Sequence, residues 1–142
     1  MNYVIIGNST AAVGCIEQIR KTDQKGKITV ISDEPYHTYG RPLISYYLLG
    51  RVDAAHMNYR PADFYEKNGV KTLLGVRAER IDPAAKKVFL QGGKSVPYDK
   101  LLVATGSRPF VPPMEGYDTV KEKFTFMTFA DALALEQALS PE

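Results

Sequence analysis

The sequence predicts an α/β fold in which a parallel sheet is followed by a three-stranded antiparallel β-meander. An apolar run at residues 3–6, an amphipathic helical stretch and a second β-branched run at residues 28–31 follow one another directly. Strands joined through a helix in this way lie parallel and are connected by a right-handed crossover. Farther along, residues 75–97 alternate between apolar and polar side chains and contain two turn signals, which is typical of antiparallel strands.

The composition is that of one folded domain. The chain has 142 residues, of which 44% are hydrophobic and 24% are charged, enough for a single core. Its net charge of +2 gives no reason to expect a nucleic-acid partner or an anionic membrane surface. No uncharged run is long enough to span a membrane, and the strand-like start is unlike a secretory signal, so we expect a cytoplasmic protein. One cysteine excludes a disulfide scaffold, a redox-active cysteine pair and a cysteine-based zinc site.

The first three elements form a strand–helix–strand unit over residues 3–32. Ser9 or Thr10 is expected to cap the amino end of the helix, and Gly26 lies just beyond its carboxyl end. The apolar positions of the helix recur on one face, as expected for a helix that packs on a sheet.

Shorter elements are expected between residue 36 and residue 104. Local signals predict a helix beginning near Pro42, a second helix over residues 61–68, a strand at residues 70–74, the meander at residues 75–97 and a buried strand at residues 101–104.

The last part of the chain begins with a proline-rich extended stretch at residues 107–118. A short strand is predicted at residues 124–127. Residues 128–131 resemble a capping box with Asp in place of Glu, and they are expected to open a final helix that ends near Leu139.

A small-residue turn follows the first strand directly, and it reads Gly7, Asn8, Ser9, Thr10, Ala11 and Ala12. Compared with G-x-G-x-x-G/A it keeps the first glycine, has Ser9 at the second position and has the permitted alanine at the third. Gly7 allows the tight turn, Ser9 leaves the backbone close to a pyrophosphate, and Ala12 lets the helix pack on the strand. Because free N–H groups at a helix amino end attract anions, residues 7–12 are predicted to bind a pyrophosphate.

Two acids follow the second strand at the expected distance. Asp33 and Glu34 lie 21 and 22 residues after Ala12, where a carboxylate accepts hydrogen bonds from ribose hydroxyls. The alternative is an ordinary strand–helix–strand turn followed by two solvated acids.

Four motifs resemble a known family when they are taken together and in order. They are Y-V-I-I-G-N-S-T-A-A, I-T-V-I-S-D-E-P, Y-G-R-P-L-I-S-Y-Y-L-L-G and Y-D-K-L-L-V-A-T-G-S-R-P. They resemble the N-terminal FAD-binding segment of the pyridine nucleotide-disulfide oxidoreductase superfamily. Within it, the chain is most similar to NADH:rubredoxin reductases, the FAD-dependent part of nitrite reductases, ferredoxin reductases and apoptosis-inducing factor. The resemblance implies a Rossmann-like FAD-binding fold of the glutathione-reductase type, incomplete relative to the family.

The resemblance assigns residues 7–12 to the FAD pyrophosphate and both acids to the adenosine ribose. Arg41 would lie along the pyrophosphate or the flavin edge, where an arginine can bind a diphosphate bidentately, and Pro42 would shape the wall of the site. The alternative for Arg41 is an ordinary surface arginine before a helix.

Two further segments match the family pattern. Ala78 matches the position whose backbone pairs with the adenine edge, although it would otherwise be an ordinary strand residue. Ala104, Thr105 and Gly106 match the end of a strand beneath the cofactor, where Gly106 would allow close approach of the backbone. The alternative for Gly106 is a simple strand-ending glycine.

The chain also departs from the family pattern. Residues 35–50 hold no cysteine pair, which excludes a flavin-to-disulfide relay, and Tyr46 stands where several relatives have a lysine beside the flavin. In the resembled reductases an NAD(P)H-binding unit follows this segment. We therefore expect residues 1–116 to be the N-terminal part of an FAD-binding domain and residues 117–142 to lead toward an absent NAD(P)H-binding domain.

The resemblance implies an FAD-dependent NAD(P)H oxidoreductase that passes electrons to a redox protein such as rubredoxin or ferredoxin, or to a small acceptor. We expect that this chain alone is not catalytically competent, and no catalytic or metal-ligating residue is assigned. The alternative is a stand-alone module that binds or senses ADP or FAD. An ordinary NAD-binding domain is disfavoured, because such domains continue with further parallel strands and helices, whereas residues 75–97 indicate a meander.

Overall fold

The computed structural model describes residues 1–139. The chain forms two compact units. The first comprises residues 1–39 and 58–106, and the second comprises residues 40–57 and the chain from residue 107 onward. Each unit is described by itself below.

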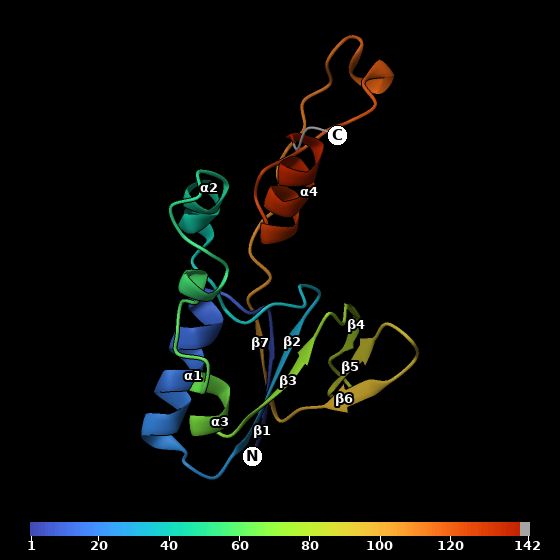
Figure 1. The fold of residues 1–142 in the computed structure, drawn as a ribbon. Coiled ribbons are helices and arrows are strands. Elements are labelled where there is room, and N and C mark those ends of the chain that lie inside the picture. The colour runs from blue at the N-terminus through green and yellow to red at the C-terminus, as the bar shows by residue number, and fades with distance from the viewer. Residues whose placement is uncertain (140–142) are drawn as a thin grey trace. The chain divides into compact units, whose positions relative to one another are not determined.

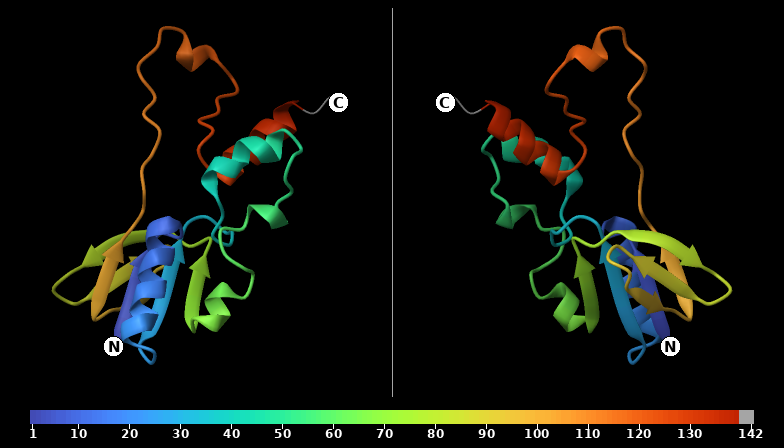
Figure 2. Two further views of the ribbon diagram at one scale, coloured as in Figure 1. Left: turned by 90° about the vertical axis from the view of Figure 1, so that its left-hand side faces the viewer. Right: turned by 90° about the vertical axis from the view of Figure 1, so that its right-hand side faces the viewer.

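The first unit is built on a four-stranded parallel sheet. Its strands are β1 (Asn2–Ile6), β2 (Lys27–Ser32), β3 (Val70–Leu74) and β7 (Lys100–Val103), in the order β3-β2-β1-β7. The helix α1 (Thr10–Thr22) connects β1 to β2 and confirms the predicted strand–helix–strand unit. The arrowheads of these strands lie along one edge of the sheet (Figure 2), so the strands deliver their carboxyl ends to the same place.

Alternation along β1 directs side chains to two separate cores. Ile5 packs on one face of the sheet against α1 and against Phe64 of α3 (Phe64–Lys67). Val4 and Ile6 point to the opposite face and pack against Val88 and other apolar side chains of the second sheet. Figure 1 shows the result, with α1 and α3 on one side of the parallel sheet and β4, β5 and β6 on the other. Each strand residue thus alternates between helix-facing and sheet-facing surroundings, as the two-residue period of a strand requires.

The predicted meander is confirmed as a three-stranded antiparallel sheet. It comprises β4 (Ala78–Asp82), β5 (Lys87–Leu90) and β6 (Ser95–Pro97), in that order. A bulge between Ala78 and Arg80 shifts the register at the start of β4.

The second unit is held together by short helices. Arg41–Leu43 forms a 3₁₀ turn that leads into α2 (Ile44–Leu48), which confirms the helix expected near Pro42. Ala55–Met57 and Tyr117–Thr119 are further 3₁₀ turns, and α4 (Phe129–Leu139) is the final helix, as predicted. The Tyr47 ring meets Phe129 edge-on with ring centroids 5.0 Å apart, and its hydroxyl donates to a Glu136 carboxylate oxygen at 3.0 Å. This contact joins α2 to α4.

Two predicted elements differ in the structure. The helix predicted over residues 61–68 is limited to Phe64–Lys67. The strand predicted at residues 124–127 is absent from the described residues. There Phe126 has a left-handed φ of 50°, and the N–H of Met127, which a strand would use for pairing, donates to Asp131 at 2.8 Å. Across residues 1–139, none of the helices has the length and apolar character needed to cross a membrane.

Candidate functional site

The candidate site lies in the first unit, at the carboxyl ends of the parallel strands. β1 lies between β2 and β7, so the strand order changes direction there, which is the place where open α/β sheets bind ligands. The Gly7 N–H donates to the Ile31 carbonyl at 2.8 Å, and the Ala104 N–H donates to the Ile6 carbonyl at 2.7 Å. These bonds extend both ladders past the ends of the strands and bring the turn after β1 next to the end of β7.

Gly7 has two physical reasons to be glycine. Its φ of 115° lies in the region that side chains rarely adopt, and a Cβ built on it would lie 2.1 Å from the carbonyl oxygen of Ala104. The turn explains the first reason, as predicted from the sequence. The second is a close approach between two strand ends far apart in the sequence, and the motif alone gave no sign of it.

The amino end of α1 has no cap from a side chain. Ser9 occupies the N-cap position, as predicted, but its hydroxyl makes no capping hydrogen bond, and the first turn contains no acidic residue. The first N–H to reach a helix carbonyl is that of Val13, which donates to Ser9 at 3.0 Å. A helix leaves the N–H groups of its first turn without intrahelical partners, and its dipole makes this end positive. The geometry is therefore that of an anion site.

Residues of the small-residue turn have different surroundings. Thr10 and Ala11 are exposed, whereas Ala12 is completely buried in the core beneath α1. The side chain of Asn8 is engaged elsewhere, because its amide nitrogen donates to the Tyr36 carbonyl at 3.2 Å and its oxygen accepts from the Tyr65 hydroxyl at 2.6 Å. The Asn8 side chain thus connects the turn to Tyr36 and Tyr65 through hydrogen bonds.

The two predicted ribose acids differ in their surroundings. Asp33 is exposed and its carboxylate has no hydrogen bond or ion pair within residues 1–139, whereas Glu34 is half-buried and accepts a hydrogen bond from the Tyr39 hydroxyl. The backbone at Glu34 is also fixed. Its N–H donates to the Ser32 hydroxyl at 3.2 Å, and its carbonyl accepts from the Gly75 N–H at 3.2 Å. Both acids leave β2 at the same sheet edge as the turn after β1.

The segment just before Ala78 is attached to this edge of the sheet. The Val76 N–H donates to the Ser32 carbonyl at 2.8 Å, so the segment that enters β4 begins beside the end of β2. Ala78 itself is half-buried and packs against the apolar cluster between the two sheets.

Thr105 and Gly106 follow β7 and are exposed. Gly106 has a φ of 71°, but no atom lies within 4 Å of a Cβ built on it. The need for glycine there comes from its backbone conformation, and the close approach between protein segments occurs at Gly7. An approach of Gly106 to a cofactor stays a prediction.

Arg41 and Pro42 belong to the second unit. They form the start of the 3₁₀ turn before α2, and the Arg41 guanidinium donates to the Met127 carbonyl at 3.2 Å. Their predicted contacts with the pyrophosphate or the flavin stay predictions.

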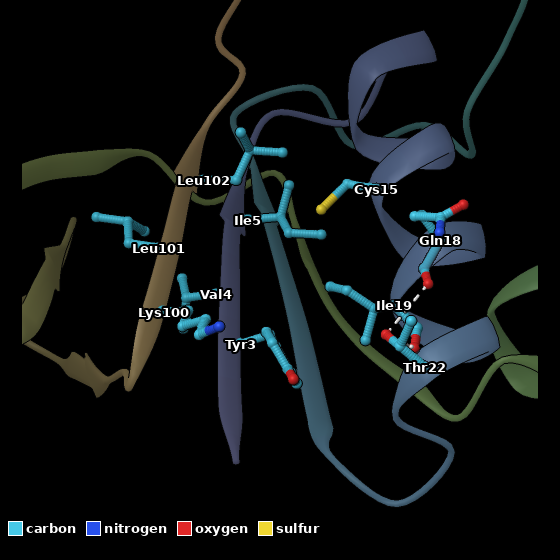
Figure 3. Close-up of a pocket in the computed structure, with 10 residues that line it drawn as sticks. All are labelled: Tyr3, Val4, Ile5, Cys15, Gln18, Ile19, Thr22, Lys100, Leu101 and Leu102. Carbon is cyan, nitrogen blue, oxygen red and sulfur yellow. Dashed lines mark hydrogen bonds between the residues drawn. The ribbon is translucent and has the colours of Figure 1, made fainter.

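A groove of about 420 Å³ lies elsewhere on the first unit, along the sides of β1 and β7 (Figure 3). Cys15 and Ile19 of α1 and Leu102 of β7 are among the residues that line it. Burial raises the pKa of the Cys15 thiol, which favours its neutral form. None of the predicted cofactor residues lines this groove, so it is separate from the carboxyl edge of the sheet. Within the part of the chain that the structure describes, no group of three His, Cys, Asp or Glu side chains is arranged to hold a metal ion.

Comparison with known proteins identifies the family. Residues 1–142 match the family described as pyridine nucleotide-disulphide oxidoreductase. The chain belongs to this family. The resemblance seen in its sequence motifs is thereby confirmed, and so is the Rossmann-like α/β fold with its antiparallel meander. The members of this family similar to the chain are FAD-dependent oxidoreductases that use NAD(P)H.

Individual members of the family are similar over nearly the whole chain. The chain is 38% identical to the nitrite reductase (NADH) large subunit of Escherichia coli (strain K12), over 96% of this chain and 16% of that subunit. Its fold matches a putidaredoxin reductase in covalent complex with putidaredoxin with a TM-score of 0.84 and 27% identity, covering 97% of this chain and 34% of the other. It also matches the NADH:rubredoxin oxidoreductase of Clostridium acetobutylicum with a TM-score of 0.81 and 26% identity, covering 96% of this chain and 35% of the other. The chain thus spans about a sixth to a third of the length of these relatives.

Proposed function

We propose that this chain binds FAD and forms the FAD-binding part of an NAD(P)H-dependent oxidoreductase that passes electrons to a redox protein. The observation that carries the proposal is the amino end of α1, which has no side-chain cap and no acid in its first turn. It opens at the carboxyl edge of a parallel sheet, where the strand order changes direction.

The residues at this edge fit the ADP half of FAD. A diphosphate requires N–H donors with little steric cover, and Gly7 and Ser9 supply a small-residue turn next to the free first turn of α1. Two carboxylates at the end of β2 suit ribose hydroxyls, and the exposed Asp33 has no competing partner within residues 1–139. We assign residues 7–12 to the pyrophosphate and Asp33 and Glu34 to the adenosine ribose.

The remaining assignments follow the family pattern. Ala78 is assigned to the adenine edge, Ala104, Thr105 and Gly106 to the backbone beneath the cofactor, and Arg41 with Pro42 to the pyrophosphate or the flavin edge. When bound, FAD supplies the capacity to accept a hydride from NAD(P)H and to release electrons to an acceptor. The chain's own residues bind the cofactor and orient it, and their role is positional and electrostatic.

The proposed electron acceptor is a small redox protein of the rubredoxin or ferredoxin type. Two of the similar structures are described by their acceptor, one as a complex of putidaredoxin reductase with putidaredoxin and one as an NADH:rubredoxin oxidoreductase. The probable ferredoxin reductase CtmF of Castellaniella defragrans is a further similar protein, at 33% identity over 97% of this chain and 34% of that protein. These names support a small redox protein as the class of acceptor for the proposed function.

One observation favours a second candidate, an adenine-nucleotide-binding module. The residues assigned to the ADP half of FAD, which are residues 7–12, Asp33, Glu34 and Ala78, all belong to the first unit, whereas Arg41 and Pro42, which would contact the pyrophosphate or flavin edge, belong to the second. A module that recognises only ADP would need nothing beyond the first unit.

Titration calorimetry with FAD, ADP and FMN separates the two candidates. FMN carries the flavin but lacks the adenosine. If the chain holds FAD as proposed, FAD binds more tightly than ADP, FMN binds far more weakly, and the loaded protein is yellow with flavin absorbance. Equal affinity for ADP and FAD, with equal thermal stabilisation, supports the module instead. Absence of binding by FAD and ADP contradicts both.

A further inference from the structure

Tyr65 links two predicted parts of the nucleotide site that are separate in the sequence. Its hydroxyl donates to the side-chain oxygen of Asn8, in the turn after β1, at 2.6 Å. The same hydroxyl accepts the backbone N–H of Thr38, in the segment that follows the two acids, at 3.1 Å. One phenol oxygen therefore holds the phosphate turn and the chain beyond the ribose acids together.

Asn8 makes a second hydrogen bond between the phosphate turn and the loop that follows the acids. Its amide nitrogen donates to the carbonyl of Tyr36 at 3.2 Å, so the side chain bonds to both Tyr65 and the loop. With the Tyr65 hydroxyl and the Thr38 N–H, these bonds form a short chain that runs from the turn through two side chains back to residues 36–38. All of these groups belong to the first unit.

The surroundings of these groups are consistent with this arrangement. Burial raises the pKa of the Tyr65 hydroxyl, so it is protonated and able to donate at neutral pH. The His37 ring lies against the Tyr65 ring with centroids 4.7 Å apart, which fixes the plane of the phenol. Thr38 is completely buried, so its N–H depends on a protein partner rather than on bulk water. The position of this loop is thus set by directional hydrogen bonds and not by apolar packing alone.

We propose that Tyr65 is a positioning residue of the nucleotide site, which sets the distance between the phosphate turn and the ribose acids through its hydrogen bonds to Asn8 and Thr38. This inference rests on the proposed function, because it assumes that residues 7–12 and the acids Asp33 and Glu34 bind one ligand. Tyr65 itself makes no contact with that ligand. Its effect is greatest for a ligand that spans both parts, such as ADP, and least for one that engages only the ribose acids, such as adenosine.

The test compares ADP and adenosine affinities of the whole chain by titration calorimetry. Tyr65→Phe removes the hydroxyl, keeps the ring and leaves the phosphate turn unchanged, so it is the primary variant. Asn8→Ala removes the same bond from the other partner, together with the bond to the Tyr36 carbonyl. Each variant is expected to weaken ADP binding about fivefold to tenfold, which corresponds to the loss of one hydrogen bond. Adenosine affinity is expected to stay within about twofold of the unsubstituted chain. The bond between Asn8 and Tyr65 is lost in both variants, whereas Asn8→Ala also loses its bond to the Tyr36 carbonyl and Tyr65→Phe also loses its bond to the Thr38 N–H. The losses in the two single variants are therefore expected to add to more than the loss in the double variant.

Tyr59→Phe is the matched control. Tyr59 is partly exposed and its ring packs against the Arg60 guanidinium, and within the described part of the chain no hydrogen bond joins its hydroxyl to Asn8, Thr38 or Tyr65, so this variant should bind ADP as the unsubstituted chain does. Unchanged ADP affinity in Tyr65→Phe and Asn8→Ala overturns the proposal. So does an equal loss for ADP and adenosine, because general destabilisation affects both ligands alike. If the unsubstituted chain binds neither ligand, the proposed function fails and this inference fails with it, whereas binding by the unsubstituted chain without a selective loss in the variants overturns the positioning role alone.

Discussion

The amino ends of α1 and α4 show two different ways to treat the same physical problem. At α4, the Thr128 hydroxyl accepts the Asp131 N–H at 3.1 Å and the Asp131 carboxylate accepts the Thr128 N–H at 2.9 Å, so the helix closes itself with a reciprocal pair. At α1, Ser9 stands in the N-cap position without such a bond, and the first turn carries no acid. The N–H groups at an open end stay available to another group, and although α2 and α3 also begin without a side-chain cap, α1 is the helix that begins at the carboxyl edge of the parallel sheet. The open end of α1 is therefore the one that we assign to a phosphate.

The largest effect is expected from Gly7→Ala, which disrupts the turn that leads into the open end of α1. The added Cβ would lie 2.1 Å from the Ala104 carbonyl oxygen, and the φ of 115° is unfavourable for alanine. We expect the free energy of unfolding to fall by about 3 kcal/mol, with loss of ADP binding. Urea unfolding and calorimetry measure the two effects. Gly14→Ala is the control, because nothing lies within 4 Å of its Cβ and it sits inside α1, so it should stabilise the chain by about 0.5–1 kcal/mol. Equal stability of both variants would contradict the packing argument.

Ser9→Asp makes the end of α1 resemble that of α4. A carboxylate there can cap the helix and interact with its dipole, so the free protein should gain about 0.5 kcal/mol of stability. The same negative charge repels a diphosphate, so ADP affinity should fall by about tenfold or more. In this one variant the free energy of unfolding should rise while the affinity for ADP falls. A rise in stability without a loss of ADP affinity would show that the anion does not bind at this end.

Arg41→Ala asks whether the second unit contributes to the binding that we assign to the first. Loss of a charged partner to the pyrophosphate should weaken FAD binding about fivefold and leave adenosine binding unchanged. Titrations with FAD and adenosine provide the comparison. Equal losses for both ligands would count against placing Arg41 at the diphosphate.

Removing the hydroxyl of Thr128 or of Ser9 compares the capping of α4 with that of α1. Thr128→Ala removes a formed capping bond, so the free energy of unfolding should fall by about 0.5–1 kcal/mol. Ser9→Ala removes a hydroxyl that makes no capping bond in the free protein, and its effect on stability should be close to zero. Urea unfolding of both variants without nucleotide decides the point, and equal losses would show that Ser9 caps α1 after all.

The smallest expected effect is on the pH dependence of stability at α4. Burial alone would raise the pKa of Asp131, but hydrogen bonds from the Met127 and Thr128 N–H groups outweigh it and hold the pKa below its usual range. A carboxyl with a lowered pKa in the folded state contributes stability that is complete above its unfolded pKa, about 4, and is lost as the pH falls through the folded value. The stability difference between the unsubstituted chain and Asp131→Asn should therefore be constant near neutral pH and shrink in acid. A difference that stays constant down to the most acidic pH at which the chain is folded would contradict this.

Local patterns were sufficient to predict most elements. The strand–helix–strand unit, the meander and the capping box at Thr128 and Asp131 each depend on neighbouring residues, and all three are confirmed. The strand predicted at residues 124–127 was wrong, because an apolar run cannot reveal that Asp131 binds the N–H groups at its end. Ser9 occupies the predicted N-cap position of α1, but its hydroxyl does not form the capping hydrogen bond that was expected.

The sequence by itself determined the family, the order of the elements and the small-residue turn that follows β1. Only the tertiary structure decided that Gly7 lies against the Ala104 carbonyl and that Tyr65 connects Asn8 to Thr38. The physical reason is separation along the chain. Periodicity, caps and turns are set by residues a few positions apart, whereas these contacts form only after parallel strands and their connections bring distant segments to one edge of the sheet.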